Sequence, residues 1–233
     1  MSEPLPIVLI PGLLASPRMY APQIPHLWRC GPVTIADHTR DESMGAIAQR
    51  ILATAPGRFA LVGLSMGGYI AFEMLRQAPQ RIARVALLDT SARADQPEQT
   101  AMRRTQMALA AHGQLSEVLE QQFPRLVHPA RRNDTALREL FALMARDVGA
   151  EAFVRQQTAI MGRSDSRTLL GSIRCPTLVL VGDADQLTPP ERAAEIAAGI
   201  AGACLVTIPD SGHVSTLEQP DEVTRALREW LEG

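Results

Sequence analysis

Short, almost continuously apolar runs recur along the chain and predict buried strands. Runs rich in valine, isoleucine and leucine, without polar alternation, are typical of strands covered on both faces of a parallel sheet. The runs are Pro6–Ile10, Val33–Ala36, Phe59–Gly63, Arg84–Leu88, Thr177–Val181 and Cys204–Ile208. We therefore expect a sheet of about six strands, most of them parallel.

Between most of these runs lie stretches with the apolar spacing of amphipathic helices. Examples are Ala46–Thr54, Gly67–Gln77 and Arg192–Ile200. A strand, a helix and a second strand in this order form a right-handed crossover, which keeps the two strands parallel. The alternation predicts an open α/β sheet flanked by helices.

One long interval, between Arg84–Leu88 and Thr177–Val181, interrupts this alternation. Its apolar residues recur at helical spacing, and no strand is predicted there. A long connection is usually functional, and ligands of open α/β folds bind at the carboxyl edge of the sheet. We predict a core domain of residues 1–91 and 172–233 and an inserted helical cap, residues 92–171. Ordinary helical packing on one face of the sheet is the alternative.

Length and charge narrow the function classes. The chain has 233 residues and a formal net charge of −2, and its charged residues are scattered. This length suits one large core, and the absence of a basic stripe argues against nucleic-acid binding. The sequence contains no lysine, which excludes Schiff-base chemistry and a phosphate-loop lysine. We expect a small-molecule partner.

The cysteines and the N-terminal residues suggest a compartment. Cys30, Cys175 and Cys204 are far apart and lack metal-ligand spacing. We interpret them as buried thiols in a reducing compartment, without a disulfide or a metal. The first residues lack the pattern of a secretion signal, and no apolar run approaches membrane-spanning length. These features predict a cytoplasmic protein with no membrane partner.

A candidate nucleophile lies directly after the third predicted strand. Gly63-Leu64-Ser65-Met66-Gly67 matches the pattern Gly-x-Ser-x-Gly between a strand and a helix. Glycines on both sides permit a turn so sharp that Ser65 adopts a strained conformation with its hydroxyl at the top of the sheet. A five-residue pattern also occurs by chance, and an ordinary turn serine is the alternative. The strand–turn–helix context favours a nucleophile.

A serine hydroxyl is a weak nucleophile, so it needs a histidine base that is oriented by a carboxylate. His213 follows the last predicted strand and is the candidate base. Most histidines are surface or packing residues, and His213 alone follows an acid candidate at the end of a strand. The remaining histidines are His26, His38, His112 and His128.

The candidate acid is Asp185, a few residues after the fifth predicted strand. It would share the sheet edge with Ser65. Asp183 and Asp89 are its competitors, and any of the three could instead cap a turn or accept backbone hydrogen bonds. Spacing after the strand favours Asp185.

Acyl transfer also needs donors for the developing oxyanion. We expect one to be the backbone N–H of Met66, which follows the nucleophile, and the other to come from the loop after the first strand. The Pro11-Gly12 turn in that loop would direct the N–H of Leu13 toward the site. A plain turn is the alternative for Pro11-Gly12.

These residues together resemble a known fold family. The chain is similar to α/β-hydrolase-fold proteins over nearly its whole length, through "PGLL", "GLSMGG", "GDADQLTPP" and "SGHVSTLEQPDEV" in that order. The resemblance implies Ser65 as nucleophile, Asp185 as acid and His213 as base. It also implies Leu13 and Met66 as oxyanion donors, with no metal and no organic cofactor.

Two departures from the family pattern are visible. Many relatives have a histidine where this chain has Pro11, so the support of the oxyanion loop must differ. The sequence also starts almost at the strand that family members number third. We therefore expect the N-terminal antiparallel hairpin to be missing.

The function that these features favour is hydrolysis of small-molecule carboxylic esters by a monomer or homodimer. Apolar cap residues could line an acyl pocket or form the core of the cap. Cap arginines could bind a substrate carboxylate or belong to an ordinary solvated surface. These arginines include Arg103, Arg104, Arg125, Arg131, Arg132, Arg138 and Arg155.

Other functions use the same residues. The triad could serve carbon–carbon bond hydrolysis, or a lyase reaction like that of the menaquinone-pathway relative. It could serve perhydrolysis, as in the cofactor-free haloperoxidases. A ligand receptor without catalysis is the alternative from another class, since some receptors on this fold retain their triads.

Overall fold

The computed structural model describes residues 4–233 and contains one six-stranded sheet with the strand order β2-β1-β3-β4-β5-β6. All the strand pairs of this sheet are parallel. The predicted parallel sheet is therefore confirmed, with bounds close to the predicted runs. The strands are β1 (Ile7–Ile10), β2 (Val33–Ile35), β3 (Phe59–Leu64), β4 (Ile82–Leu88), β5 (Thr177–Gly182) and β6 (Cys204–Ile208).

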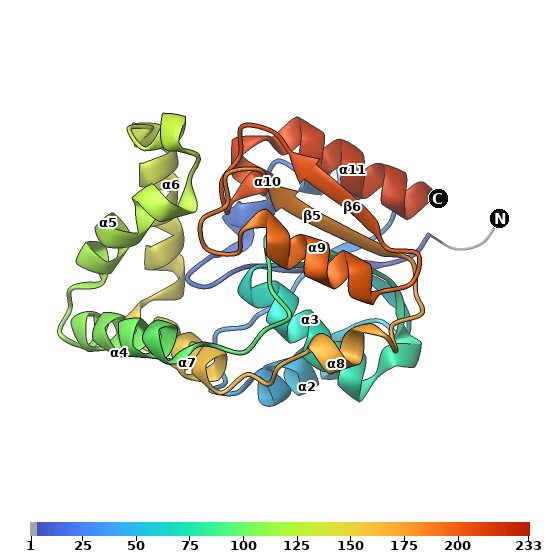
Figure 1. Ribbon diagram of the computed structural model, residues 1–233, viewed down its shortest axis with the longest axis horizontal. Coiled ribbons are helices and arrows are strands. Elements are labelled where there is room, and N and C mark those ends of the chain that lie inside the picture. Colours follow the sequence, from blue (N-terminus) through green and yellow to red (C-terminus); the bar gives the residue numbers. More distant parts are fainter. Residues whose placement is uncertain (1–3) are drawn as a thin grey trace.

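Helices cover both faces of the sheet and make a three-layer arrangement (Figure 1). Successive side chains of a strand point to opposite faces, so Val8 and Leu61 pack with α2, α3 and α9, whereas Leu9 and Val62 pack with α1 and α11. The core helices are α1 (Ile24–Leu27), α2 (Met44–Thr54), α3 (Met66–Gln77), α9 (Pro190–Gly199), α10 (Ser215–Glu218) and α11 (Pro220–Glu232).

The two edge strands differ from the prediction that every strand is buried on both faces. β1, β3 and β5 are buried along their whole length, but β2 and β6 are not. Each edge strand has a neighbour on one side only, and Leu205 in β6 is 42% exposed.

The three cysteines are also more exposed than predicted. Cys204 in β6 is exposed, Cys30 and Cys175 are half-buried, and all three are free thiols. The interpretation of three buried thiols is therefore wrong.

The chain between β4 and β5 is helical, as predicted, and the structure describes no strand in it. Figure 1 shows its first helices on the left, on the side toward which β5 and β6 point. A small apolar cluster of Ala110, Val118, Ala145 and Phe153 joins these helices, and Leu14 of the core packs into it. The helices are α4 (Pro97–Ala111), α5 (Leu115–Leu126), α6 (Thr135–Val148), α7 (Ala150–Met161) and α8 (Arg167–Leu170).

The structure also describes three short 3-10 helices, η1 (Pro17–Tyr20), η2 (Pro79–Arg81) and η3 (Pro129–Arg131).

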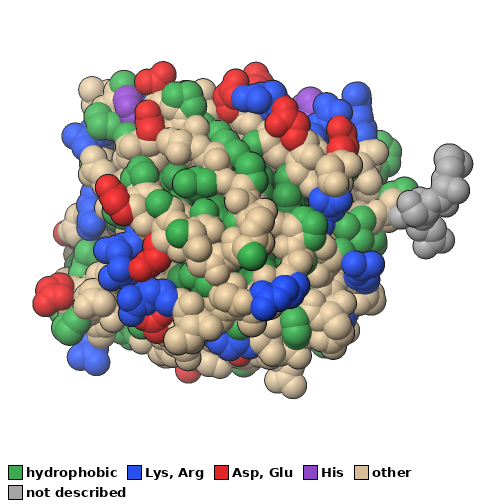
Figure 2. Space-filling view, turned by 45° about the vertical axis from the view of Figure 1, so that its right-hand side comes forward, with side chains coloured by type: hydrophobic (Ala, Val, Ile, Leu, Met, Phe, Trp, Pro, Cys, Tyr) green, Lys and Arg blue, Asp and Glu red, His purple; other side chains and the backbone are tan. Residues whose placement is uncertain are grey.

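On the face drawn in Figure 2, basic and acidic side chains are interspersed among apolar and polar ones. None of the helices in residues 4–233 combines the length and the apolar character that crossing a membrane requires.

Candidate active site

Ser65 occupies a strained turn between β3 and α3. Its φ of 53° and ψ of −112° lie outside the usual regions for a non-glycine residue. A Cβ added at Gly63 would lie 2.3 Å from the carbonyl oxygen of Gly67, and one at Gly67 would lie 2.1 Å from that of Ile10. Only glycine fits at either position, which explains the two glycines of the Gly-x-Ser-x-Gly pattern.

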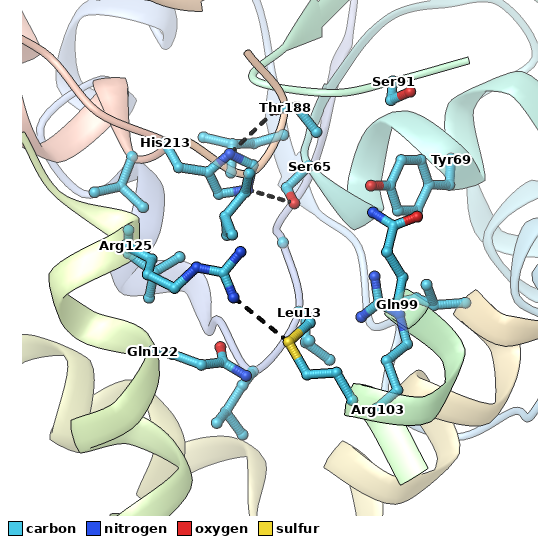
Figure 3. A pocket seen from close by; sticks show the side chains of 18 of the residues that line it. Leu13, Ser65, Tyr69, Ser91, Gln99, Arg103, Gln122, Arg125, Thr188 and His213 are labelled. Atoms are coloured by element: carbon cyan, nitrogen blue, oxygen red, sulfur yellow. Dashed lines mark hydrogen bonds between the residues drawn. The ribbon is translucent and has the colours of Figure 1, made fainter. Parts of the chain in front are cut away.

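His213 and Asp185 lie in a hydrogen-bonded row with this serine. His213 Nε2 is 2.8 Å from Ser65 Oγ, and His213 Nδ1 is 2.8 Å from Asp185 Oδ2. His213 and Asp185 are 4% and 3% exposed, so solvent hardly competes for these contacts. The backbone N–H of His213 donates to the carbonyl oxygen of Leu126 at the end of α5. The structure thus brings together the three residues that the sequence predicted, and Figure 3 shows the contact between His213 and Ser65.

A turn after β5 holds the Asp185 carboxylate. Oδ1 accepts hydrogen bonds from the N–H groups of Leu187 and Thr188, at 2.8 and 3.0 Å. The Thr188 hydroxyl donates to Oδ2 at 2.7 Å and lies 3.2 Å from His213 Nδ1. Sequence reasoning missed Thr188; the only local signal was Asp185 itself, a residue type whose carboxylate often accepts from N–H groups a few residues on.

The surroundings of this row favour an ionised Asp185 and a His213 that binds a proton readily, as a general base must. Burial favours the neutral carboxyl of Asp185, but the charge of His213 and hydrogen bonds from His213 and Thr188 outweigh it and lower the pKa of Asp185. Burial likewise opposes the charged form of His213, but Asp185, and further away Asp89 and Glu218, raise the pKa of His213. When His213 is neutral with its proton on Nδ1, its Nε2 lone pair faces Ser65.

The competing acids have other partners. Asp183 accepts a hydrogen bond from the N–H of Ser211 at 3.1 Å. Asp89 is completely buried and accepts from the N–H of Gly182 at 3.0 Å and from Ser215 Oγ at 2.6 Å. Burial, with a smaller contribution from the nearby charge of Asp185, raises the pKa of Asp89 to about 7. Within residues 4–233, neither carboxylate hydrogen-bonds to His213.

The other histidines lie outside the row, but one of them, His38, contacts the loop that carries Leu13. His38 is buried, and its Nε2 lies 2.9 Å from the carbonyl oxygen of Gly12. It therefore supports the loop in which Pro11 replaces the family histidine. No motif or spacing in the sequence marks His38 for this position.

The two predicted oxyanion donors are free to bind an anion. In the described part of the chain, the N–H groups of Leu13 and Met66 donate to no protein acceptor. Met66 is the first residue of α3, where a helix leaves its N–H groups unsatisfied. The next residue of the other loop, Leu14, has a φ of 56° and donates to Gln156 Oε1 of α7 at 3.0 Å. This hydrogen bond fixes the loop that carries Leu13.

A cavity of about 330 Å³ lies above Ser65. The loops that follow β1, β3 and β6 contribute Leu13, Ser65 and His213 to its wall. The helices between β4 and β5 contribute apolar and arginine side chains; the apolar ones are Met102, Leu119, Leu126, Phe141 and Ile160. Among the residues that the structure describes, no group of three His, Cys, Asp or Glu side chains is arranged to hold a metal.

A serine on a sharp, strained turn between a strand and a helix, at the top of a parallel sheet, is the nucleophile position of α/β-hydrolases. The chain belongs to the alpha/beta hydrolase family, whose model matches residues 7–226. The resemblance inferred from the sequence motifs is therefore confirmed.

Individual relatives share this fold over most of the chain. A thermophilic esterase from Thermogutta terrifontis, solved with malate bound, has a TM-score of 0.88 and 32% identity and covers 100% of this chain and 91% of its own. A pimeloyl-[acyl-carrier protein] methyl ester esterase of Chromobacterium violaceum is 26% identical over 191 residues, which are 80% of this chain and 75% of the relative.

A relative named after a different reaction has a similar sequence identity to this chain. The "Putative non-heme bromoperoxidase BpoC" of Mycobacterium tuberculosis is 25% identical over 242 residues, covering 95% of this chain and 92% of its own. Esterases and a bromoperoxidase thus stand at comparable distances from this chain. The family establishes an α/β-hydrolase enzyme, and the choice of reaction depends on the site.

Proposed function

We propose that this protein is a serine hydrolase that cleaves small-molecule carboxylic esters through an acyl-enzyme on Ser65. The observation that carries the proposal is the row Ser65 Oγ, His213 and Asp185, with both contacts at 2.8 Å, at the floor of a cavity large enough for a small ester. In this row His213 can accept the Ser65 proton at Nε2 while Asp185 holds its Nδ1–H, which is the arrangement that ester cleavage requires.

The reaction follows from these positions. His213 Nε2 takes the hydroxyl proton while Ser65 Oγ bonds to the ester carbonyl carbon. The carbonyl oxygen becomes an oxyanion, which the N–H groups of Leu13 and Met66 stabilise. The carbon–oxygen bond to the alcohol then breaks, and His213 protonates the leaving alkoxide. Water, deprotonated by His213, attacks the acyl-enzyme and releases the acid and Ser65.

The proposal includes a substrate-binding cap. The helical segment 92–171 supplies Leu119, Phe141 and Ile160 to the cavity wall and the Leu126 carbonyl to the backbone of His213. These contacts support a cap that shapes the substrate pocket and contributes to the position of the base.

Perhydrolysis is a second candidate, because one relative is named as a bromoperoxidase. The same acyl-enzyme opened by hydrogen peroxide instead of water gives a peroxy acid, which oxidises halide. A halogenation assay with acetate and peroxide measures this activity. Halogenation that requires Ser65 and exceeds ester hydrolysis would favour perhydrolysis.

The experiment that tests ester hydrolysis is turnover of p-nitrophenyl esters from acetate to decanoate. We expect Ser65→Ala to abolish turnover while its melting temperature stays near that of the wild type. Ser172→Ala is the matched control, because Ser172 is exposed and does not line the cavity. Wild-type turnover no faster than that of Ser65→Ala would contradict the esterase proposal.

A further inference from the structure

The cavity above Ser65 has an unusual charge distribution. Of the described residues that line it, none is an aspartate or a glutamate, although acidic residues outnumber basic ones in the chain as a whole. Its basic lining residues are Arg93, Arg103, Arg125, Arg163 and Arg192. An excess of one sign of charge in a concave site attracts ligands of the opposite sign.

Three of these arginines share two carboxylates that lie just outside the cavity wall. Arg93 makes a bidentate pair with Glu195, at 2.9 and 2.7 Å. Asp95, with a side chain only 2% exposed, pairs with both Arg103 and Arg163. Two guanidinium groups therefore share a single carboxylate, and one positive charge remains uncompensated there.

The remaining two, Arg125 and Arg192, form no ion pair with any carboxylate of residues 4–233. Arg125 Nη1 instead donates to the thioether sulfur of Met102 at 3.4 Å. A thioether is a weak acceptor without charge, so this contact orients the guanidinium and leaves its charge available. Figure 3 shows Arg125 extending from α5 across the cavity, beneath Ser65 and His213.

We propose that the ester carries an anionic group, a carboxylate or a phosphate, which Arg125 binds while the ester carbonyl lies at Ser65. The inference rests on the proposed ester hydrolysis and names its substrate class. A guanidinium donates two parallel hydrogen bonds to either anion. Apolar lining residues such as Leu119 and Phe141 contact the short chain that joins this anion to the ester.

The test compares p-nitrophenyl esters of equal length whose acyl chains end in a carboxylate, a phosphonate or the neutral methyl ester. They are assayed with the wild type, Arg125→Gln and the control Arg104→Gln. Arg104 is exposed on α4 and does not line the cavity, so its variant removes a cap charge without changing the site. Varying the salt concentration separates direct binding from long-range attraction.

We expect the wild type to prefer an anionic ester and Arg125→Gln to lower its kcat/KM by about 10-fold, since Arg125 is also open to solvent, which screens the interaction. The neutral ester should change little, and Arg104→Gln should resemble the wild type. A preference for the carboxylate assigns monoesters of dicarboxylic acids, and a preference for the phosphonate assigns a phosphate-bearing substrate. Equal rates for the three esters would overturn the inference while leaving ester hydrolysis intact.

Calorimetry separates failure of this inference from failure of the esterase proposal. Monomethyl glutarate is titrated into the inactive Ser65→Ala protein, with and without Arg125→Gln. Binding that needs Arg125, together with no wild-type turnover of any ester, would retain the anion site and reject ester hydrolysis. Turnover without binding that depends on Arg125 would reject the anion site alone.

Discussion

His38 Nε2 lies 2.9 Å from the carbonyl oxygen of Gly12, and this contact connects the loop after β2 to the loop after β1. The peptide between Gly12 and Leu13 is planar and trans, so its carbonyl and its N–H point in opposite directions. A histidine that fixes the carbonyl therefore also directs the Leu13 N–H. Burial lowers the pKa of His38, so the neutral ring donates from Nε2 to this carbonyl.

We expect loss of this contact to weaken oxyanion stabilisation. His38→Leu should lower kcat for a p-nitrophenyl ester by about 10- to 100-fold with little change in KM, because the missing interaction acts mainly in the transition state. His38→Gln retains an N–H donor and should recover part of the loss. His112→Leu, at an exposed histidine that follows α4, is the control. A change confined to KM would contradict this role for His38.

Two conservative amide substitutions distinguish the acid of the triad. Asp185→Asn should lower kcat by roughly 10³- to 10⁴-fold, because an amide cannot hold the His213 tautomer or stabilise its charged form. Asp89→Asn should keep most of the activity, since Asp89 bonds to Gly182 and Ser215 and not to His213. Steady-state kinetics and melting temperatures of both variants check this. The reverse pattern would assign the acid to Asp89.

The pH profile should show an acid limb that belongs to His213. Ester cleavage needs the neutral base, and neighbouring carboxylates raise the pKa of His213 above its usual value. kcat/KM should therefore fall as the pH decreases through a midpoint above about 6.5. Asp89, with a pKa of about 7, is only partly ionised in this range, so Asp89→Asn should move the midpoint to lower pH by a small amount. An unchanged midpoint in that variant would contradict the electrostatic coupling.

The turn around Ser65 should tolerate no side chain at Gly67. A Cβ there would lie 2.1 Å from a backbone oxygen, so Gly67→Ala should destabilise the protein by about 3 kcal/mol or more. Gly57→Ala should change stability by less than about 0.5 kcal/mol, because nothing lies within 4 Å of a Cβ added at Gly57. Urea unfolding of both variants compares them directly. Equal stabilities would show that the turn relaxes around the new methyl group.

The sequence predicts those parts of the structure that depend on local order along the chain. The strand runs, and the positions of Ser65, Asp185 and His213 after their strands, follow from periodicity and from the order that the chemistry needs. The edge positions of β2 and β6 cannot be predicted in this way, because strand order depends on long-range pairing and not on local hydrophobicity.

Contacts between distant segments are equally hidden in the sequence. His38 and Gly12 meet only because β2 pairs with β1. The arginines between β4 and β5 look alike in the sequence, yet Arg125 lines the cavity and Arg104 does not. Which face of a helix meets the active site is decided by tertiary packing, so periodicity could not separate these two residues.

The helical segment leaves the sheet after β4 and returns at β5, which is the neighbour of β4 and pairs with it from Val85 to Leu88. The candidate nucleophile, base and acid, Ser65, His213 and Asp185, follow strands of the sheet, whereas Arg103, Arg125 and Arg163 belong to the segment. Side chains of the segment that only line the cavity can therefore change without disturbing this row, whereas Gln156, which holds the loop of Leu13, cannot. A gene for this protein could acquire a new substrate by mutation at the cavity-lining positions of the segment, while Ser65, His213, Asp185 and the contacts that hold them are inherited unchanged.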